Sequence, residues 1–354
     1  MSIFTQNSND RVIAGWLLFC AFVIYGMIVL GGVTRLTGSG LSMVEWKPIM
    51  GVIPPLNQKE WEETFTKYQQ FPEYEKVNRH FDVEEFKKIF IFEYSHRVLG
   101  RIIGILFLIP FLYFLFRKRI SSDLSPKLWA LFVLGGLQGL MGWYMVKSGL
   151  VDMPRVSQYR LTAHLGIAVV IYGYMLWVAF DLLFPKVNLQ ESHGVNQLSS
   201  FKKFSFALMC IIFLMILSGG LVAGSRAGFV YNTFPLMDGR FIPVGLYNME
   251  PLWRNIFEDL TTVQFNHRIF AYIITLIVIV FFVMGMKRSI SRRSKLGLVA
   301  VLITLVVQVI LGISALLLIV PVSIAAAHQA GAIALFTAAI FTTHSLYSDC
   351  SEKA

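Results

Sequence analysis

The sequence has few charged residues and no arrangement of cysteines that suggests thiol chemistry. Only 15% of its 354 residues are charged and 56% are hydrophobic, whereas about 25% of residues are charged in an average soluble domain. Cys20, Cys210 and Cys350 form no CxxC pair and no outward-facing disulfide framework. The first ten residues lack the arginine-rich pattern of a transit peptide, and no small-residue cleavage site follows the apolar run from Val12. We therefore expect an integral membrane protein whose first helix is retained.

Eight apolar runs are each long enough to cross a bilayer, which takes about 20 residues in a helix. We expect an all-α fold with spans at about residues 12–33, 95–116, 127–146, 159–184, 204–224, 262–286, 296–320 and 322–346. An even number of spans places both termini on the same side of the membrane. The first two spans are separated by a long connection, residues 34–92.

The formal charge of +10 is explained by topology. Lysine and arginine collect in the connections after the second, fourth and sixth spans, whereas the opposite connections mix acids with bases. Basic connections stay in the cytoplasm, so both termini are predicted to be cytoplasmic and residues 34–92 to face outward. This distribution argues against a nucleic-acid partner. The expected location is the inner (cytoplasmic) membrane of a bacterial cell.

The second half of the chain repeats features of the first. Two pairs of motifs match, Glu93-Tyr-Ser-His96-Arg97 with Gln264-Phe-Asn-His267-Arg268 and Ala163-His164 with Ala327-His328. Weaker matches are Gln138 and Gln308, each four residues before a glycine, and the pairs Gly31-Gly32 and Gly219-Gly220. Four spans separate equivalent helices, so the halves share one orientation and are related by an axis along the membrane normal. We predict two pseudo-symmetric four-helix bundles, residues 1–184 and 185–354.

Each half supplies two histidines near the outer ends of its spans, His96 and His164 in the first and His267 and His328 in the second. Two imidazoles on facing helices can hold the iron of a flat haem between them. Zinc and copper sites gather three or four close ligands, often Cys, Asp or Glu, so haem fits the ligand count better. A single such histidine could simply hydrogen-bond a neighbouring helix, but the duplicated pattern favours iron.

The arginines that follow two of these histidines can be interpreted in two ways. Arg97 and Arg268 each follow a histidine, and could pair with haem propionates or extend to the membrane interface. Three further histidines, His80, His193 and His344, have no partner in the repeat and are assigned no role.

The repeat is broken where Glu93 corresponds to Gln264. Glu93 lies one helical turn before His96, on the same face of the helix. A carboxyl group beside a haem can deliver protons, whereas the amide of Gln264 cannot do so at ordinary pH. The alternative is an inert carboxylate near a helix N-terminus. We predict that the first half carries the chemistry and the second half carries electrons.

At these residues the sequence resembles the haem A synthase family, in the form found in alphaproteobacteria and mitochondria. The resemblance covers nearly the whole chain and is most specific in residues 31–43, 45–55, 93–101, 231–238 and 264–268. It implies an oxidoreductase that converts a methyl group of haem O to the formyl group of haem A by two successive oxygen-dependent hydroxylations, for cytochrome oxidase.

The resemblance also implies roles for the site residues. His267 and His328 would bind a resident haem b, His96 and His164 would face the substrate haem, and Glu93 would be the functional carboxylate. Some relatives carry a cysteine pair in an outer loop, which this chain lacks.

The implied partners are haem O synthase, which is a protohaem farnesyltransferase, and assembly factors of cytochrome oxidase. The electron donor is unknown, and a homo-oligomer is compatible with the sequence. Two other functions stay open, a quinol-linked di-haem b electron-transfer cytochrome and a haem transporter or assembly scaffold. The first would place haems near both membrane faces, whereas all four histidines favour one face. The second leaves the difference between Glu93 and Gln264 unexplained.

Overall fold

The structure is a computed structural model that describes residues 8–45, 53–150, 156–184 and 195–348. Eight of the described helices are long and apolar enough to cross a membrane, which confirms the predicted all-α fold with eight spans. They are α1 (Ser8–Leu36), α4 (Val83–Phe116), α5 (Ser125–Gly149), α6 (Gln158–Leu183), α7 (Val195–Ser225), α8 (Leu260–Met286), α9 (Arg292–Leu317) and α10 (Val322–Ser348). His193, Cys350, part of the motif at 45–55 and the start of the predicted second half at residue 185 lie outside the described residues.

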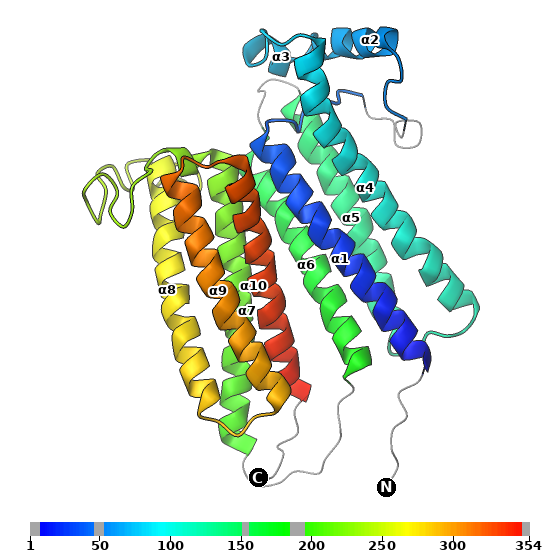
Figure 1. The fold of residues 1–354 in the computed structure, drawn as a ribbon, viewed down its shortest axis with the longest axis vertical. Coiled ribbons are helices and arrows are strands. Elements are labelled where there is room, and N and C mark those ends of the chain that lie inside the picture. The colour runs from blue at the N-terminus through cyan, green and yellow to red at the C-terminus, as the bar shows by residue number, and fades with distance from the viewer. Residues whose placement is uncertain (1–7, 46–52, 151–155, 185–194, 349–354) are drawn as a thin grey trace.

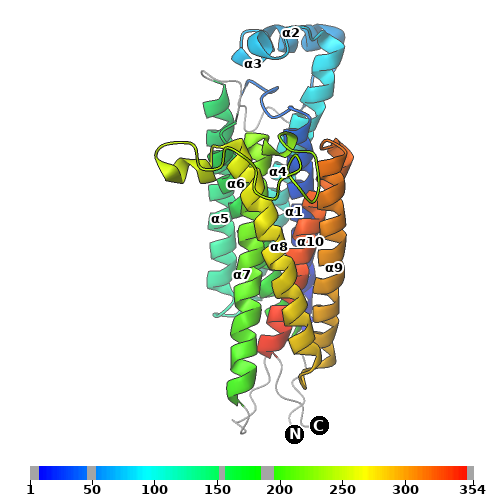
Figure 2. The same ribbon diagram turned by 90° about the vertical axis from the view of Figure 1, so that its left-hand side faces the viewer.

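The spans stand side by side, with α1, α4, α5 and α6 on one side of the molecule and α7 to α10 on the other (Figure 1). We call these sets the first half and the second half. Between them, α1 contacts α10, and α6 contacts both α7 and α10. α1 begins and α10 ends at the same end of the molecule, as an even number of spans requires (Figures 1 and 2).

Close packing between the halves depends on glycines at equivalent positions. Gly32 of α1 lies against the side chain of Gln329 of α10, whose Nε2 donates a hydrogen bond of 2.7 Å to the carbonyl of Ile28. Gly220 of α7 lies against Leu165 of α6. The first helix of each half therefore packs on the last helix of the other, at a small residue that lets the helices approach.

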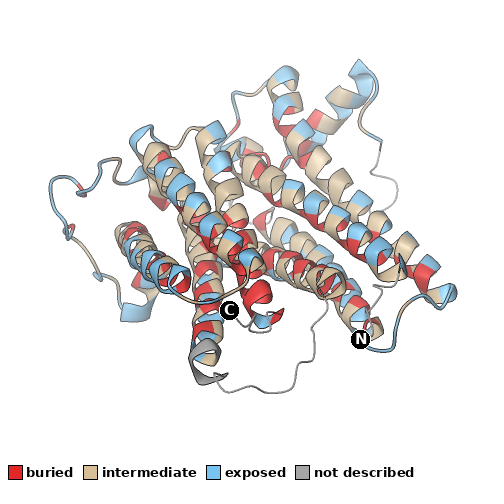
Figure 3. Cartoon of the chain, turned by 60° about the horizontal axis from the view of Figure 1, so that its bottom comes forward, coloured by how far each residue is buried: buried red, intermediate tan, exposed pale blue. Residues whose placement is uncertain are grey.

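Buried residues lie on the helix faces that meet other helices, and many outward faces remain apolar and exposed (Figure 3). One apolar core runs through both halves, with Leu17 and Phe111 among its residues in the first half and Val278 and Ile333 in the second. Exposed Phe22, Ile109 and Leu276 are typical of surface that faces lipid.

The connection between α1 and α4 forms a small cap above the first half (Figure 2). It contains α2 (Gln58–Tyr68) and α3 (Pro72–Lys76). Helix α4 begins at Val83, about a dozen residues before the predicted start of the second span, so that boundary was wrong. Asp82 accepts from the backbone N–H of Glu85, and Glu85 accepts from that of Asp82, which is a capping box that starts the helix before the apolar run.

The cap has its own aromatic core and one buried acid. Tyr68 stacks on Phe86 with ring centroids 4.9 Å apart, and its hydroxyl donates to Glu73 Oε2 at 3.2 Å. Asn78 Nδ2 donates to the same hydroxyl at 2.8 Å. Burial, together with the nearby charge of Glu93, raises the pKa of Glu73 from 4.5 to about 8. The first residues of α4 are therefore part of a packed unit.

Candidate functional site

The structure brings the four predicted histidines together as two pairs. His96 of α4 and His164 of α6 lie close enough to interact electrostatically, and so do His267 of α8 and His328 of α10. Within the described part of the chain, no three His, Cys, Asp or Glu side chains are grouped as metal ligands. Each half therefore offers two imidazoles, which suits haem iron better than zinc.

Each histidine faces a glycine on a neighbouring helix of its own half: His96 faces Gly31, His164 faces Gly142, His267 faces Gly219, and His328 faces Gly312. A side-chain carbon at Gly312 would lie 2.7 Å from His328 Cε1, and one at Gly142 would lie 3.0 Å from His164 Cε1. The repeated glycines noted in the sequence therefore make room for the imidazole rings.

Two glutamines adjoin the histidines in the same repeated way. Gln138 Nε2 lies 3.4 Å from His164 Nε2, and Gln308 Nε2 lies 3.5 Å from His328 Nε2. The Nδ1 atoms of both histidines are buried without a partner in the described chain. A buried polar atom left unpaired costs about 1–3 kcal/mol. An imidazole with one nitrogen unpaired can still bind iron through its ring, so these histidines fit a site that is completed by an iron-bearing group.

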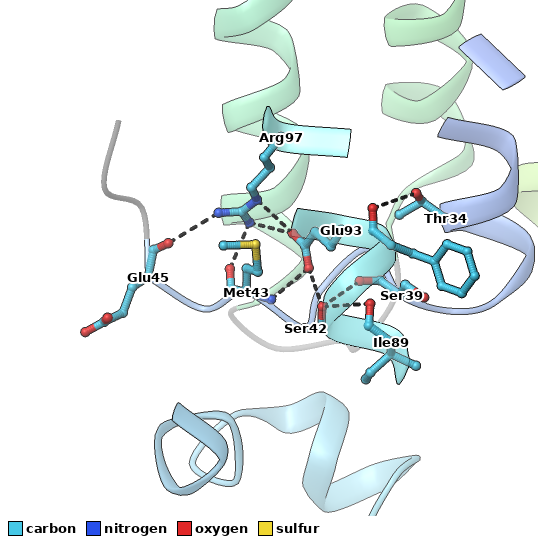
Figure 4. A network of polar contacts seen from close by, with 9 residues as sticks. Thr34, Ser39, Ser42, Met43, Glu45, Ile89, Glu93 and Arg97 are labelled. Atoms are coloured by element: carbon cyan, nitrogen blue, oxygen red, sulfur yellow. Dashed lines mark hydrogen bonds and ion pairs between the residues drawn. The ribbon is translucent and has the colours of Figure 1, made fainter. Parts of the chain in front are cut away.

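Glu93 and Arg97, about three to four turns into α4, join this helix to the loop that follows α1 (Figure 4). The carboxylate of Glu93 is buried, pairs with the Arg97 guanidinium at 2.5 Å, and accepts from Ser42 Oγ at 2.8 Å and from the Met43 backbone N–H at 2.7 Å. Arg97 also donates to the carbonyls of Met43 and Glu45. The pair holds this loop over the first histidine site.

Gln264 and Arg268, near the start of α8, likewise hold an outer loop. Gln264 Nε2 donates to the carbonyl of Tyr231 at 3.0 Å, and Arg268 donates to the carbonyls of Tyr231 and Thr233, both at 2.8 Å. These carbonyls lie in the loop after α7. Both halves therefore use the polar residues beside their histidines to hold an outer loop.

Arg97 and Arg268 donate hydrogen bonds to groups of the protein itself, which the sequence did not predict. Both guanidinium groups donate to loop carbonyls, and Arg97 also pairs with Glu93. Arg268 Nε is buried with no partner in the described chain, so one donor remains for an anionic group. Contact with haem propionates stays a prediction for both residues.

Among the other histidines, His80 stacks edge-on against Phe81 in the cap. His344 is buried, and its Nε2 lies 3.2 Å from Asp181 Oδ1, whose other oxygen accepts from Lys127 Nζ at 2.8 Å. This cluster joins α5, α6 and α10. The acid within the apolar run of α6 was the available sequence signal, because intramembrane acids usually have a partner.

Comparisons with known proteins identify the family of this chain. Residues 14–340 match the family model COX15-CtaA, described as cytochrome oxidase assembly protein. The chain is similar to "Heme A synthase" of Nitrosospira multiformis, with 55% identity over 95% of this chain and 94% of that protein. It is also similar to "Heme A synthase COX15" of Homo sapiens, with 44% identity over 96% of this chain and 84% of that protein. "Heme A synthase" of Nitrosomonas eutropha is 53% identical over 96% of this chain and 95% of that protein.

Proposed function

This chain belongs to the COX15-CtaA family of cytochrome oxidase assembly proteins, and on that premise we propose that it is a haem A synthase acting on haem O. It is a multi-pass membrane protein, placed by the proposal in the inner membrane with both termini in the cytoplasm. The observation that carries the proposal is the presence of two histidine pairs, each beside repeated glycines, in a chain whose relatives are named heme A synthase.

We assign the substrate to the first half because it has more room. In the repeat, Gly135 and Gly139 of α5 correspond to Leu305 and Val309 of α9. Both glycines are exposed and a side-chain carbon at either would meet no atom within 4 Å, whereas Leu305 is buried in the core and Val309 packs against it. Haem O carries a long farnesyl-derived chain that haem b lacks, so the roomier half suits haem O.

The proposed reaction is two successive oxygen-dependent hydroxylations at one methyl carbon of haem O. Loss of water from the geminal diol then leaves the aldehyde of haem A. Haem iron supplies the oxygen and electron chemistry when haem is bound. His96 and His164 would orient the substrate haem, and His267 and His328 would hold a resident haem b, which would supply electron transfer.

Glu93 is the proposed proton-handling group of the first half. Its carboxylate can hold a proton at Oε2, the oxygen that receives hydrogen bonds from Ser42 and Met43, while Oε1 stays paired with Arg97. Gln264 occupies the equivalent place in the second half and holds its loop without an ionisable group. The difference supports chemistry in the first half.

The decisive experiment compares Glu93→Gln with Ser42→Ala in membranes supplied with haem O. We expect Glu93→Gln to keep the haem b spectrum and to reduce haem A formation at least about 100-fold, which is within the range of lost acid–base catalysis. Ser42→Ala keeps the carboxylate and should retain most of the synthesis. Extraction and mass analysis of the bound haems give the result.

Full haem A synthesis by Glu93→Gln would overturn the proton-handling role. An equal loss in Ser42→Ala would show that Glu93 acts by holding the loop. Haem B alone, bound by the unsubstituted protein despite abundant haem O, would favour the electron-transfer cytochrome over the synthase.

A further inference from the structure

Within the described chain, His267 is the one of the four histidines that has a side-chain hydroxyl at a ring nitrogen. Ser218 Oγ of α7 lies 3.0 Å from His267 Nδ1 of α8. Gly219, the next residue, faces Cε1 of the same ring, where a side-chain carbon would lie 3.5 Å away. The ring is therefore bordered by two consecutive residues of one helix, of which the serine binds it and the glycine leaves it space.

The contact is not the usual behaviour of a serine in an apolar helix, where the hydroxyl bonds a carbonyl of its own helix. Ser205 and Ser225, on the same helix, do this, donating to the carbonyls of Lys202 and Val222. The hydroxyl of Ser218 instead lies within hydrogen-bond distance of an imidazole on another helix. Its hydroxyl is thus directed at His267.

Among the described residues of the first half, no side-chain hydroxyl lies at a ring nitrogen of His96 or His164. Alignment of Gly31-Gly32 with Gly219-Gly220 places Leu30 opposite Ser218. His96 keeps its glycine neighbour, since Gly31 faces its Nε2, but a leucine side chain cannot hydrogen-bond an imidazole. The two halves therefore differ at one position of their first helix. Ser218 can hold the histidine ring of the next spanning helix, and Leu30, its counterpart, cannot.

We propose that Ser218 is a positioning residue that fixes His267 as a permanent haem ligand, and that Leu30 leaves His96 less firmly held so that the first site can exchange its haem. The inference rests on the proposed function, because it takes these histidines as haem ligands. In a neutral imidazole that binds iron through Nε2, Nδ1 carries the hydrogen. Donation from Nδ1 to Ser218 Oγ selects that tautomer and holds the ring plane.

The asymmetry matches what each haem must do. A resident electron carrier benefits from a ligand that stays in place. A substrate has to enter, react and leave as product, so a ligand held by packing alone is better suited to it. Partners of this kind typically change metal affinity by about 10- to 100-fold when removed.

The test uses Ser218→Thr and Ser218→Val in the full-length purified protein, because these side chains have the same shape and differ in the hydroxyl. We expect Ser218→Val to release haem b to apomyoglobin about tenfold faster and to shift the electron paramagnetic resonance g-values of the low-spin ferric haem. Ser218→Thr should resemble the unsubstituted protein. Ser205→Ala, which removes a hydroxyl about 20 Å away along α7 by helix rise, is the matched control.

Equal release rates and spectra for Ser218→Val and Ser218→Thr would overturn the role of the hydroxyl. His267→Ala is measured beside them, and retention of an unchanged haem b in that variant would overturn the role as well, since His267 would then not be a ligand. These readouts do not use haem A formation. A failure of the synthase proposal, seen as absent haem A with haem b present, is therefore distinguishable.

Leu30→Ser tests the other half of the inference. The new hydroxyl should slow the loss of haem O from the first site by a factor of several, measured after loading with haem O. An unchanged rate of loss would overturn the proposal that Leu30 leaves His96 less firmly held. The role of Ser218 is tested separately by the variants above.

Discussion

The two halves share one arrangement of histidines, glycines and an arginine, and they differ in the other residues that surround the histidines. In each, a histidine in the second span faces a glycine in the first, a histidine in the fourth faces a glycine in the third, and an arginine holds the preceding outer loop. In the first half, the ionisable residue Glu93 accompanies this arrangement, and α5 carries Gly135 and Gly139. In the second half these positions are Gln264 and the larger Leu305 and Val309.

Under the proposed function, this comparison separates the residues expected to hold a haem from those expected to make one half reactive. Features common to both halves are expected to serve binding, because both sites need it. Features found in one half are the candidates for chemistry, substrate size and exchange. α5 also packs less extensively against α4 and α6 than α9 does against α8 and α10, so α5 is the more loosely packed of these two equivalent helices.

The largest effect should come from removing one ligand in each half. Under the proposed assignment, His328→Ala should lose the resident haem b and, with it, all haem A formation, because the proposed route for electrons to the first site is removed. His164→Ala should keep the haem b spectrum and lose haem A formation. Pyridine haemochrome spectra and mass analysis of extracted haems test this, and loss of haem b in His164→Ala instead would reverse the assignment of the halves.

Filling the glycine-lined side of α5 should affect the substrate alone. Gly139→Val copies the residue found at position 309 and places a branched side chain where the described chain has no atom within 4 Å of the added carbon. We expect the KM for haem O to rise about tenfold or more while haem b occupancy is unchanged. Val309→Gly, the reciprocal variant, should leave that KM as it was. An unaltered KM in Gly139→Val would show that haem O does not use this space.

Small side chains added beside the histidines should have graded effects within the second half. The added carbon of Gly312→Ala would lie 2.7 Å from His328, whereas that of Gly219→Ala would lie 3.5 Å from His267, an ordinary contact. Gly312→Ala should therefore lower haem b occupancy severalfold and Gly219→Ala should not. Similar occupancy in both variants would mean that His328 can move without loss of the haem.

The smallest effect concerns the cap, which the second half lacks. The folded protein binds the proton of Glu73 more tightly than the unfolded chain does, because burial raises its pKa from 4.5 to about 8. Its contribution to cap stability is complete below about pH 4.5 and is lost as the pH rises through about 8. Glu73→Gln should flatten this dependence, measured as hydrogen exchange of residues 58–76 between pH 5 and 9. An unchanged pH profile would contradict the buried, protonated state of Glu73.

The spans were predictable from the sequence because a bilayer sets the length of an apolar helix. α8 begins at Leu260 and α6 at Gln158, within two residues of expectation. The pairing of the histidines was predictable for a different reason, since the repeated motifs imply equivalent surroundings. These features depend on periodicity and repetition, which one sequence displays.

Other features depend on contacts between distant residues. The polar start of α4 reads as loop until Phe86 and Phe90 are seen packed with Tyr68 of the cap. Arg97 was expected to pair with a haem propionate or to extend to the membrane interface, and its loop acceptors could not be inferred from spacing. Ser218 is an ordinary serine in an apolar run until His267 is found beside it.

The reciprocal packing of α1 on α10 and of α7 on α6 has an implication for origin. Two identical four-helix chains related by a twofold axis would make these contacts twice, as an isologous dimer interface. Gene duplication and fusion of such a dimer would preserve the interface and free one copy of each site to diverge. The side chains at Gly32 and Gly220, Gln329 and Leu165, are then the divergent descendants of a single original contact.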